Sequence, residues 1–197
     1  MRSRLLSLAA VAIAALTLAC GDAQRVVAPE SSAFRVPQNA SFNLLGSGRA
    51  DVAERDHALR SDGHAERNIG PEGGVLSVPD AGLTIIVPPG AVSHRVKIGV
   101  RAVKGSAIHY EFEPHGIVFN VPLIAIQRLN GISASSLGAG LYAAYVAHDQ
   151  DVDEKNGTAN IAQVFGVAID ASAGTATFHI PHFSGYILAS GRCSNND

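Results

Sequence analysis

Residues 75–87 carry the sequence Val-Leu-Ser-Val-Pro-Asp-Ala-Gly-Leu-Thr-Ile-Ile-Val, in which two short apolar runs flank a Pro-Asp-Ala-Gly segment at 79–82. Valine, isoleucine and threonine fit the pleated, half-buried surface of a sheet, whereas proline and glycine favour a turn. The stretch therefore predicts a β-hairpin, with strands at 75–78 and 83–87 joined by the turn at 79–82.

Similar short runs fill the rest of the chain beyond residue 68. Residues 95–101 alternate charged and apolar side chains, the pattern of a strand with one buried face. Further runs follow at 123–127, 141–146, 164–169, 175–180 and 186–188, with a turn signal at 171–174. Eight or more short strands with no convincing helical period predict an all-β fold over residues 68–191, an antiparallel β-sandwich. Residues 192–197 are predicted to be a disordered tail.

The N-terminal residues differ from this pattern. Arg2 and Arg4 precede an uncharged apolar run at 5–19 that ends just before Cys20. A basic start, a short apolar core and a small residue before the cleavage point predict a secretory signal peptide over residues 1–19. A membrane-spanning helix is the weaker alternative, because the run is shorter than the roughly 20 residues that crossing a bilayer needs.

The segment Leu-Thr-Leu-Ala-Cys at 16–20 resembles the lipobox of bacterial lipoproteins. This resemblance implies that Cys20 is lipidated and becomes the mature N-terminus, and several acyl chains would hold the protein on a membrane. Plain secretion is the alternative. Because Cys193 is the only other cysteine, a lipidated Cys20 leaves no internal disulfide, whereas an unmodified one leaves a Cys20–Cys193 bridge open.

The resemblance to bacterial lipoproteins also implies that the protein is located in the bacterial cell envelope. Gly21 stands where many lipoproteins retained at the inner membrane have an aspartate, which favours the outer membrane or the cell surface. Residues 20–67 contain prolines, a Gly-Ser-Gly patch and mixed charges, and are predicted to form a flexible tether with a short helix near 50–60.

The overall charge of the chain limits the classes of partner that it is expected to bind. The chain of 197 residues has 15 Lys and Arg against 17 Asp and Glu, without a basic run, which argues against nucleic acid as a partner. The expected partners are a membrane, through the lipid anchor, and an unidentified protein.

Four segments in fixed order resemble one known family. They are Ile-Gly-Pro-Glu-Gly-Gly-Val-Leu at 69–76, Leu-Thr-Ile-Ile-Val-Pro-Pro-Gly-Ala-Val at 83–92, Phe-Glu-Pro-His-Gly-Ile-Val-Phe at 112–119 and His-Phe-Ser-Gly-Tyr at 182–186. Together they resemble the ZU-five (ZU5) domain, the β-sandwich of zonula occludens proteins, ankyrins and netrin receptors. The resemblance implies a protein-interaction or packing module, and it transfers no ligand.

The last of these segments also resembles the cleavage site of related autoprocessing domains in death-domain scaffold and inflammasome proteins. By that resemblance Ser184 would attack the carbonyl of Phe183, and a nearby side chain would act as base. The candidate bases are His182, His179, His109 and Glu111. The alternative, favoured from the residues themselves, places Phe183 in the core and Ser184 in the last turn.

Other motifs predict no metal or cofactor. His179 and His182, three apart on a strand, would point to opposite faces, and the chain has no HExxH or paired CxxC motif. The acidic residues at 149–154 fail the spacing of a calcium-binding loop and favour a solvated surface loop. Phosphate-binding loops and the GxSxG motif are also absent from the sequence. The aromatic residues on the expected strands are assigned to the core rather than to a ligand platform.

The sequence therefore predicts a membrane-anchored lipoprotein of the cell envelope, with a ZU5-like β-sandwich that binds or packs and does not catalyse. Two alternatives stay open. One is an autoproteolytic domain that cleaves between Phe183 and Ser184, and the other is a structural module without a ligand.

Overall fold

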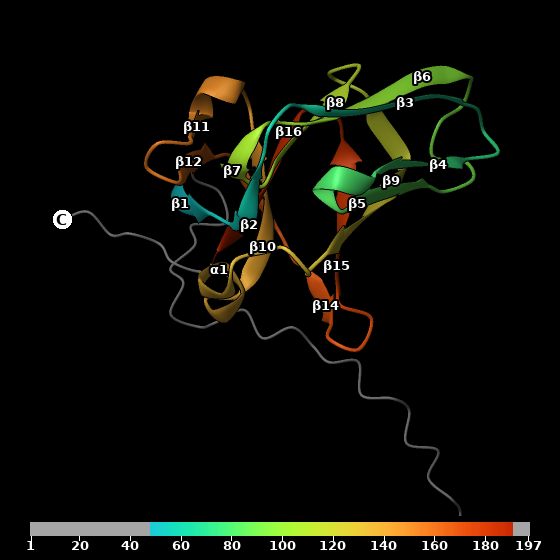
Figure 1. The fold of residues 1–197 in the computed structure, drawn as a ribbon. Coiled ribbons are helices and arrows are strands. Elements are labelled where there is room, and N and C mark those ends of the chain that lie inside the picture. Colours follow the sequence, from blue (N-terminus) through green and yellow to red (C-terminus); the bar gives the residue numbers. More distant parts are fainter. Residues whose placement is uncertain (1–47, 191–197) are drawn as a thin grey trace, which may run out of the picture. The chain divides into compact units, whose positions relative to one another are not determined.

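A computed structural model describes residues 48–190, and strands dominate this range (Figure 1). Sixteen strands, β1 to β16, form three antiparallel sheets, accompanied by one short helix, α1 (Ala134–Gly138), and two 3-10 turns, η1 (Pro79–Ala81) and η2 (Asp149–Asp151). The predicted all-β sandwich is confirmed. No helix within residues 48–190 is long and apolar enough to cross a membrane. The predicted signal peptide, Cys20, residues 21–47 of the tether and the tail at 192–197 lie outside the described residues.

Two sheets make up most of the fold. The nine-stranded sheet contains, in order, β11 (Val152–Asp153), β12 (Thr158–Ile161), β1 (Gly48–Val52), β16 (Gly185–Ser190), β8 (His109–Glu113), β6 (Val96–Ala102) and β3 (Gly63–Ile69), with β10 (Leu141–Val146) beside β16 and β13 (Gln163–Phe165) beside β10. The five-stranded sheet is β14 (Ala168–Asp170), β15 (Thr175–His182), β9 (Val118–Arg128), β5 (Leu83–Val87) and β4 (Gly74–Val78). Strands β2 (Glu54–Leu59) and β7 (Gly105–Ala107) pair separately.

The hairpin predicted at 75–87 is present as β4 and β5. Val78 pairs with Leu83, and the turn between them ends at Gly82, whose φ of 70° lies in the left-handed region that glycine adopts without strain. Leu76 and Ile85 pair directly and are both buried, so the period-2 alternation directs one face of the hairpin into the core.

The prediction of a flexible tether is wrong for residues 48–67, as is the short helix near 50–60, because this segment forms β1, β2 and most of β3. Strand β3 is mostly exposed and polar, and it is held through seven successive backbone pairs with β6. In β1 only small side chains are buried, Ala50 and Val52. Backbone pairing leaves no trace in amino-acid composition, so the sequence of a polar edge strand looks like that of a flexible linker.

Two apolar clusters meet at β16. Tyr186 and Leu188 belong to the large cluster between the two main sheets, whereas the alternate residues Ile187 and Ala189 belong to a second cluster on the other face. All six residues of β16 are therefore buried. The predicted single strand at 164–169 is instead divided between β13 and β14, which join different sheets.

Candidate functional site

The corner between β15 and β16 carries the predicted cleavage site. The side chain of Phe183 fills the core: the residue is 2% exposed, and its ring stacks on Phe112 with centroids 5.2 Å apart and meets Phe119 edge-on at 4.7 Å. Four aromatic residues thus pack on one another here, because the ring of Tyr186 also contacts Phe112. The arrangement matches the alternative in which Phe183 is a core residue.

Backbone hydrogen bonds tie this corner to β8 and the segment after it. The N–H of Gly116 donates to the carbonyl of Phe183 at 3.3 Å, and the N–H of Phe112 donates to the carbonyl of Ser184 at 3.1 Å. Ser184 is 6% exposed, and its hydroxyl forms no hydrogen bond with another residue in the range 48–190. Within that range the serine therefore has a fixed backbone and no bonded base.

The two histidines proposed from the sequence lie in different surroundings. His182 is held by its neighbours, since Nε2 lies 3.2 Å from Oε1 of Gln163 and the hydroxyl of Tyr186 donates to its carbonyl at 2.9 Å. Burial lowers the pKa of the His182 imidazole. His179 is exposed on β15, where it pairs with Ile124. His182 and Ser184 line a common groove, and His179 is not among the lining residues.

That groove has a volume of about 760 Å³ and opens beside the corner. Its walls are polar and aromatic, with His115, Tyr145, His148 and Gln163 around the backbone of residues 182–185. Val118 stands at the groove with 77% of its surface exposed.

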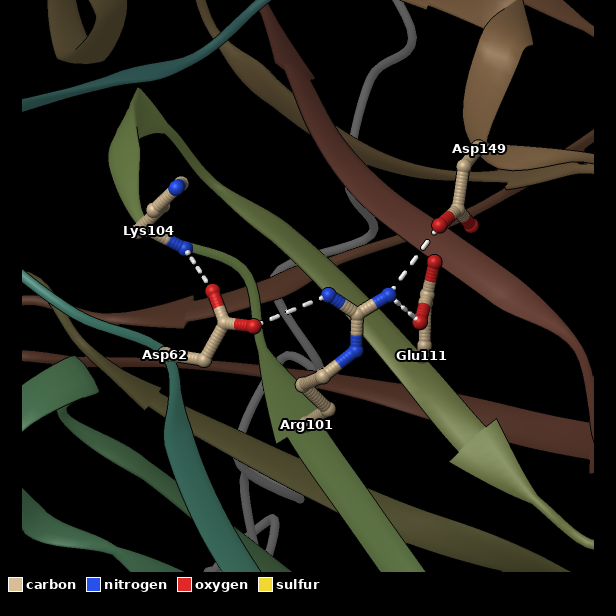
Figure 2. A network of polar contacts seen from close by, with 5 residues as sticks. All are labelled: Asp62, Arg101, Lys104, Glu111 and Asp149. Atoms are coloured by element: carbon tan, nitrogen blue, oxygen red, sulfur yellow. Dashed lines mark hydrogen bonds and ion pairs between the residues drawn. The ribbon is translucent and has the colours of Figure 1, made fainter.

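A network of charged side chains adjoins the groove (Figure 2). Arg101 on β6 lies at its centre: Nη1 pairs with Asp62 at 3.0 Å, and Nη2 pairs with Asp149 at 3.0 Å and with Glu111. Arg101 and Glu111 are direct partners in the pairing of β6 with β8, so the register itself brings their side chains together. A backbone hydrogen bond from Lys104, followed by the bond from Arg101, lowers the pKa of Asp62.

His109 lies two residues before Glu111 on the same strand. Alternate residues of β8 face opposite sides, so Tyr110 and Phe112 enter the core while His109 and Glu111 share the other face. His109 is 2% exposed, and its Nε2 has no hydrogen-bond partner within residues 48–190. Burial lowers the pKa of His109 to about 4, with Arg101 and Arg55 acting in the same direction and Asp149 opposing them.

This burial predicts a pH-dependent loss of stability. In the unfolded chain a histidine titrates near 6.5, so between pH 6.5 and 4 the unfolded state binds the extra proton and the folded state does not. The contribution of the neutral His109 imidazole to the free energy of unfolding is therefore complete above pH 6.5. It decreases by on the order of 3 kcal/mol as the pH drops toward 4. Urea denaturation at several pH values, in the presence of a chelator, measures it.

The matched variants for this prediction are His109→Gln and His94→Gln, the second at an exposed position. Carboxylates also titrate below pH 5, so the difference between wild type and His109→Gln isolates the imidazole. We expect a flatter pH profile for His109→Gln and the wild-type profile for His94→Gln. Parallel profiles for all three proteins would contradict the assignment.

The acidic segment at 149–154 lies at the surface, and two of its carboxylates, those of Asp151 and Asp153, are engaged locally. Asp151 accepts the N–H of His148, and Asp153 accepts the N–H and the side-chain amide of Asn156. Asp149 alone points to Arg101. Among residues 48–190, the one group of three side chains close enough to share a metal ion is His109, Glu111 and Asp149.

The sequence offered His109 and Glu111 only as possible bases from a facing strand, placed Asp149 only in a solvated acidic loop, and gave Arg101 no role beyond its strand. The alternation His-Tyr-Glu-Phe at 109–112 was the available signal, since it places two titratable groups on one face of a strand whose other face is aromatic. Nothing in the sequence indicated that residues 62 and 149 approach that strand.

In a comparison with protein-family models, the ZU5 domain model matches residues 65–111. The matched range begins in β3 and ends at Glu111 of β8, so it includes the hairpin at 75–87 and the strand that carries His109. Among curated proteins, no match to the chain is found.

Proposed function

From the match of the ZU5 domain model to residues 65–111, we propose that this chain is a lipid-anchored protein of the bacterial cell envelope whose β-sandwich binds a protein partner and does not catalyse a reaction. The lipobox-like segment at 16–20 supports the anchor on Cys20, and Gly21 supports the outer membrane or cell surface as its location. The partner would meet the domain at the groove beside residues 182–185.

The observation that carries this proposal is the environment of Ser184. An activated serine needs a base within hydrogen-bond reach of its hydroxyl. Among residues 48–190 no such bond is made, and His182 is directed instead to Gln163 and Tyr186. The neighbouring Phe183 is locked among aromatic rings. These features fit a packed corner that shapes an interaction surface.

Partner binding is tested by photo-crosslinking in whole cells. A photoreactive residue at Val118 stands at the groove, and one at Ala171 occupies the turn before β15, at the end of that strand far from His182. We expect a specific crosslinked product from position 118 and none from position 171. Equal products from both positions, or none from position 118 at native expression, would contradict a groove-bound partner and favour a structural module without a ligand.

Anchoring is tested by intact mass. Protein extracted from membranes should lack residues 1–19 and carry a lipid mass on Cys20, whereas a Cys20→Ala variant should leave the membrane fraction. A wild-type chain that is cleaved without lipid would instead indicate plain secretion.

One observation favours self-cleavage as a second candidate function. The carbonyl of Phe183 accepts the N–H of Gly116, which is the kind of fixed donor that stabilises negative charge on a carbonyl oxygen under attack. In that reaction the Ser184 oxygen would add to the Phe183 carbonyl carbon while its proton passes to a base. The C–N bond would then break as the amine takes up a proton, and water would hydrolyse the resulting ester.

Denaturing mass spectrometry separates the two candidates. Cleavage would release residues 184–197, which β16 keeps bound to β8 and β10 until the protein is unfolded. We expect one intact species. Two species that divide between Phe183 and Ser184, and that disappear in Ser184→Ala, would replace the non-catalytic proposal with autoproteolysis.

A further inference from the structure

We propose that His109, Glu111 and Asp149 form a binding site for a divalent transition-metal ion with nitrogen and oxygen preference, of which Zn²⁺ and Mn²⁺ are the examples. Each residue offers one ligand atom, and these atoms lie within 4.8 Å of one another.

The fold brings these ligands together from two elements. His109 and Glu111 are two residues apart on β8 and therefore point to one face of the sheet. Asp149 begins the turn η2, which a hydrogen bond from the N–H of His148 to Asp151 stabilises. The side chain of Asp149 is 65% exposed, so it has the freedom to close the remaining distance to a bound ion.

Two atoms of the cluster are buried without a partner. Nε2 of His109 and Oε1 of Glu111 are shielded from solvent, and neither makes a hydrogen bond within the described part of the chain. The two residues are 2% and 9% exposed. A buried polar atom without a partner is costly, and most such atoms in folded proteins are satisfied. A metal ion between them would coordinate both at once.

Arg101 holds one oxygen of the Glu111 carboxylate and one of the Asp149 carboxylate, and it leaves the other oxygen of each unbound. Its Nη2 binds Oε2 of Glu111 and Oδ2 of Asp149, so Oε1 and Oδ1 are available for an ion (Figure 2). Three carboxylates, those of Asp62, Glu111 and Asp149, share this one guanidinium. The excess of negative charge in the network favours a divalent cation. Arg101 is therefore a positioning residue for the site.

The donor set indicates the class of metal. One imidazole nitrogen and two carboxylate oxygens suit Zn²⁺, Mn²⁺ or Fe²⁺, whereas Ca²⁺ and Mg²⁺ prefer oxygen alone and Cu⁺ prefers sulfur. Three protein ligands leave a coordination position for water or a small anion. Asp149 is among the residues that line the groove, so an ion that it helps to hold would lie beside the groove.

The test uses the mature chain, freed of metal with a chelator and titrated calorimetrically with Zn²⁺, Mn²⁺ and Ca²⁺ separately. We expect one equivalent of Zn²⁺ or Mn²⁺ to bind and to raise Tm, and Ca²⁺ to bind far more weakly. Substitution with Co²⁺ should give absorption bands that report nitrogen and oxygen ligands. An absence of binding by both Zn²⁺ and Mn²⁺ overturns the proposal.

Matched variants locate the ion. His109→Gln and Asp149→Asn should each weaken binding by about 100-fold or more, since even outer-shell changes cost metal sites about 10- to 100-fold. Asp149→Asn is the decisive variant because 65% of the Asp149 side chain is exposed, so an isosteric substitution there opens no buried cavity. His94→Gln and Asp56→Asn, both exposed, are the controls. Binding that survives Asp149→Asn at wild-type affinity would place the ion elsewhere and overturn the assignment.

Discussion

Replacing Phe112 with alanine is expected to lower the free energy of unfolding by about 3–5 kcal/mol, a large share of the stability of a single domain. Phe112 is fully buried, its ring stacks on Phe183 and it meets the ring of Tyr186 edge-on, with centroids 5.8 Å apart. Removing the ring leaves a cavity between the two main sheets that the rigid neighbouring rings cannot fill. Urea denaturation measures the loss.

The control for this prediction is Val118→Ala. Val118 is 77% exposed, and surface substitutions of this kind usually change stability by less than about 0.5 kcal/mol. A loss for Phe112→Ala as small as that for Val118→Ala would show that the aromatic cluster does not hold the sheets together.

Replacing Gly73 with alanine is expected to cost about 4 kcal/mol, because left-handed strain and a steric clash add. Gly73 has a φ of 78°, and a Cβ built there would lie 2.3 Å from the carbonyl oxygen of Val87 and 2.9 Å from the carbonyl carbon of Pro88. Both are backbone atoms, so no side-chain rotation relieves the contact. Accommodation would require β5 to move away from the turn that precedes β4. A fall in Tm and in the urea midpoint reports the effect.

Gly90→Ala separates the two contributions. Gly90 has a φ of 80°, but a Cβ there would meet nothing within 4 Å. Only the left-handed strain remains, about 1–2 kcal/mol. Equal losses of stability in the two variants would contradict this prediction. They would mean that movements of β4 and β5 relieve the clash at Gly73, which the packing of these strands does not suggest.

Strands with a clear apolar alternation were predictable from the sequence, and strands held mainly by the backbone were not. The hairpin at 75–87 buries Leu76, Val78, Ile85 and Val87 on one face, so its pattern is visible in the residue types. In β3 the charged and polar side chains face solvent, and the stabilising partner is β6, far along the chain. The described part of the domain therefore already includes residue 48, well before the boundary predicted at 68.

In the candidate site, too, some residues were predictable from the sequence and others were not. The sequence indicated Phe183 and Ser184 as a candidate cleavage site because they are adjacent and belong to a recognisable motif. It also suggested that Phe183 is a core residue. The charged network needs residues 62, 101, 111 and 149, which only the pairing of β6 with β8 and the turn η2 bring together. No local pattern encodes such an encounter.

The position of β16 has a consequence for how the chain is made. This strand pairs with β1, β8 and β10, and among residues 48–190 it is the last element in sequence order. Synthesis and any export proceed from the N-terminus, so these three partners emerge before the strand that joins them. The nine-stranded sheet therefore cannot be completed until residues 185–190 are present, because β16 joins β8 to β1 and β10, and its pairing with β1 closes a loop across almost the whole described domain.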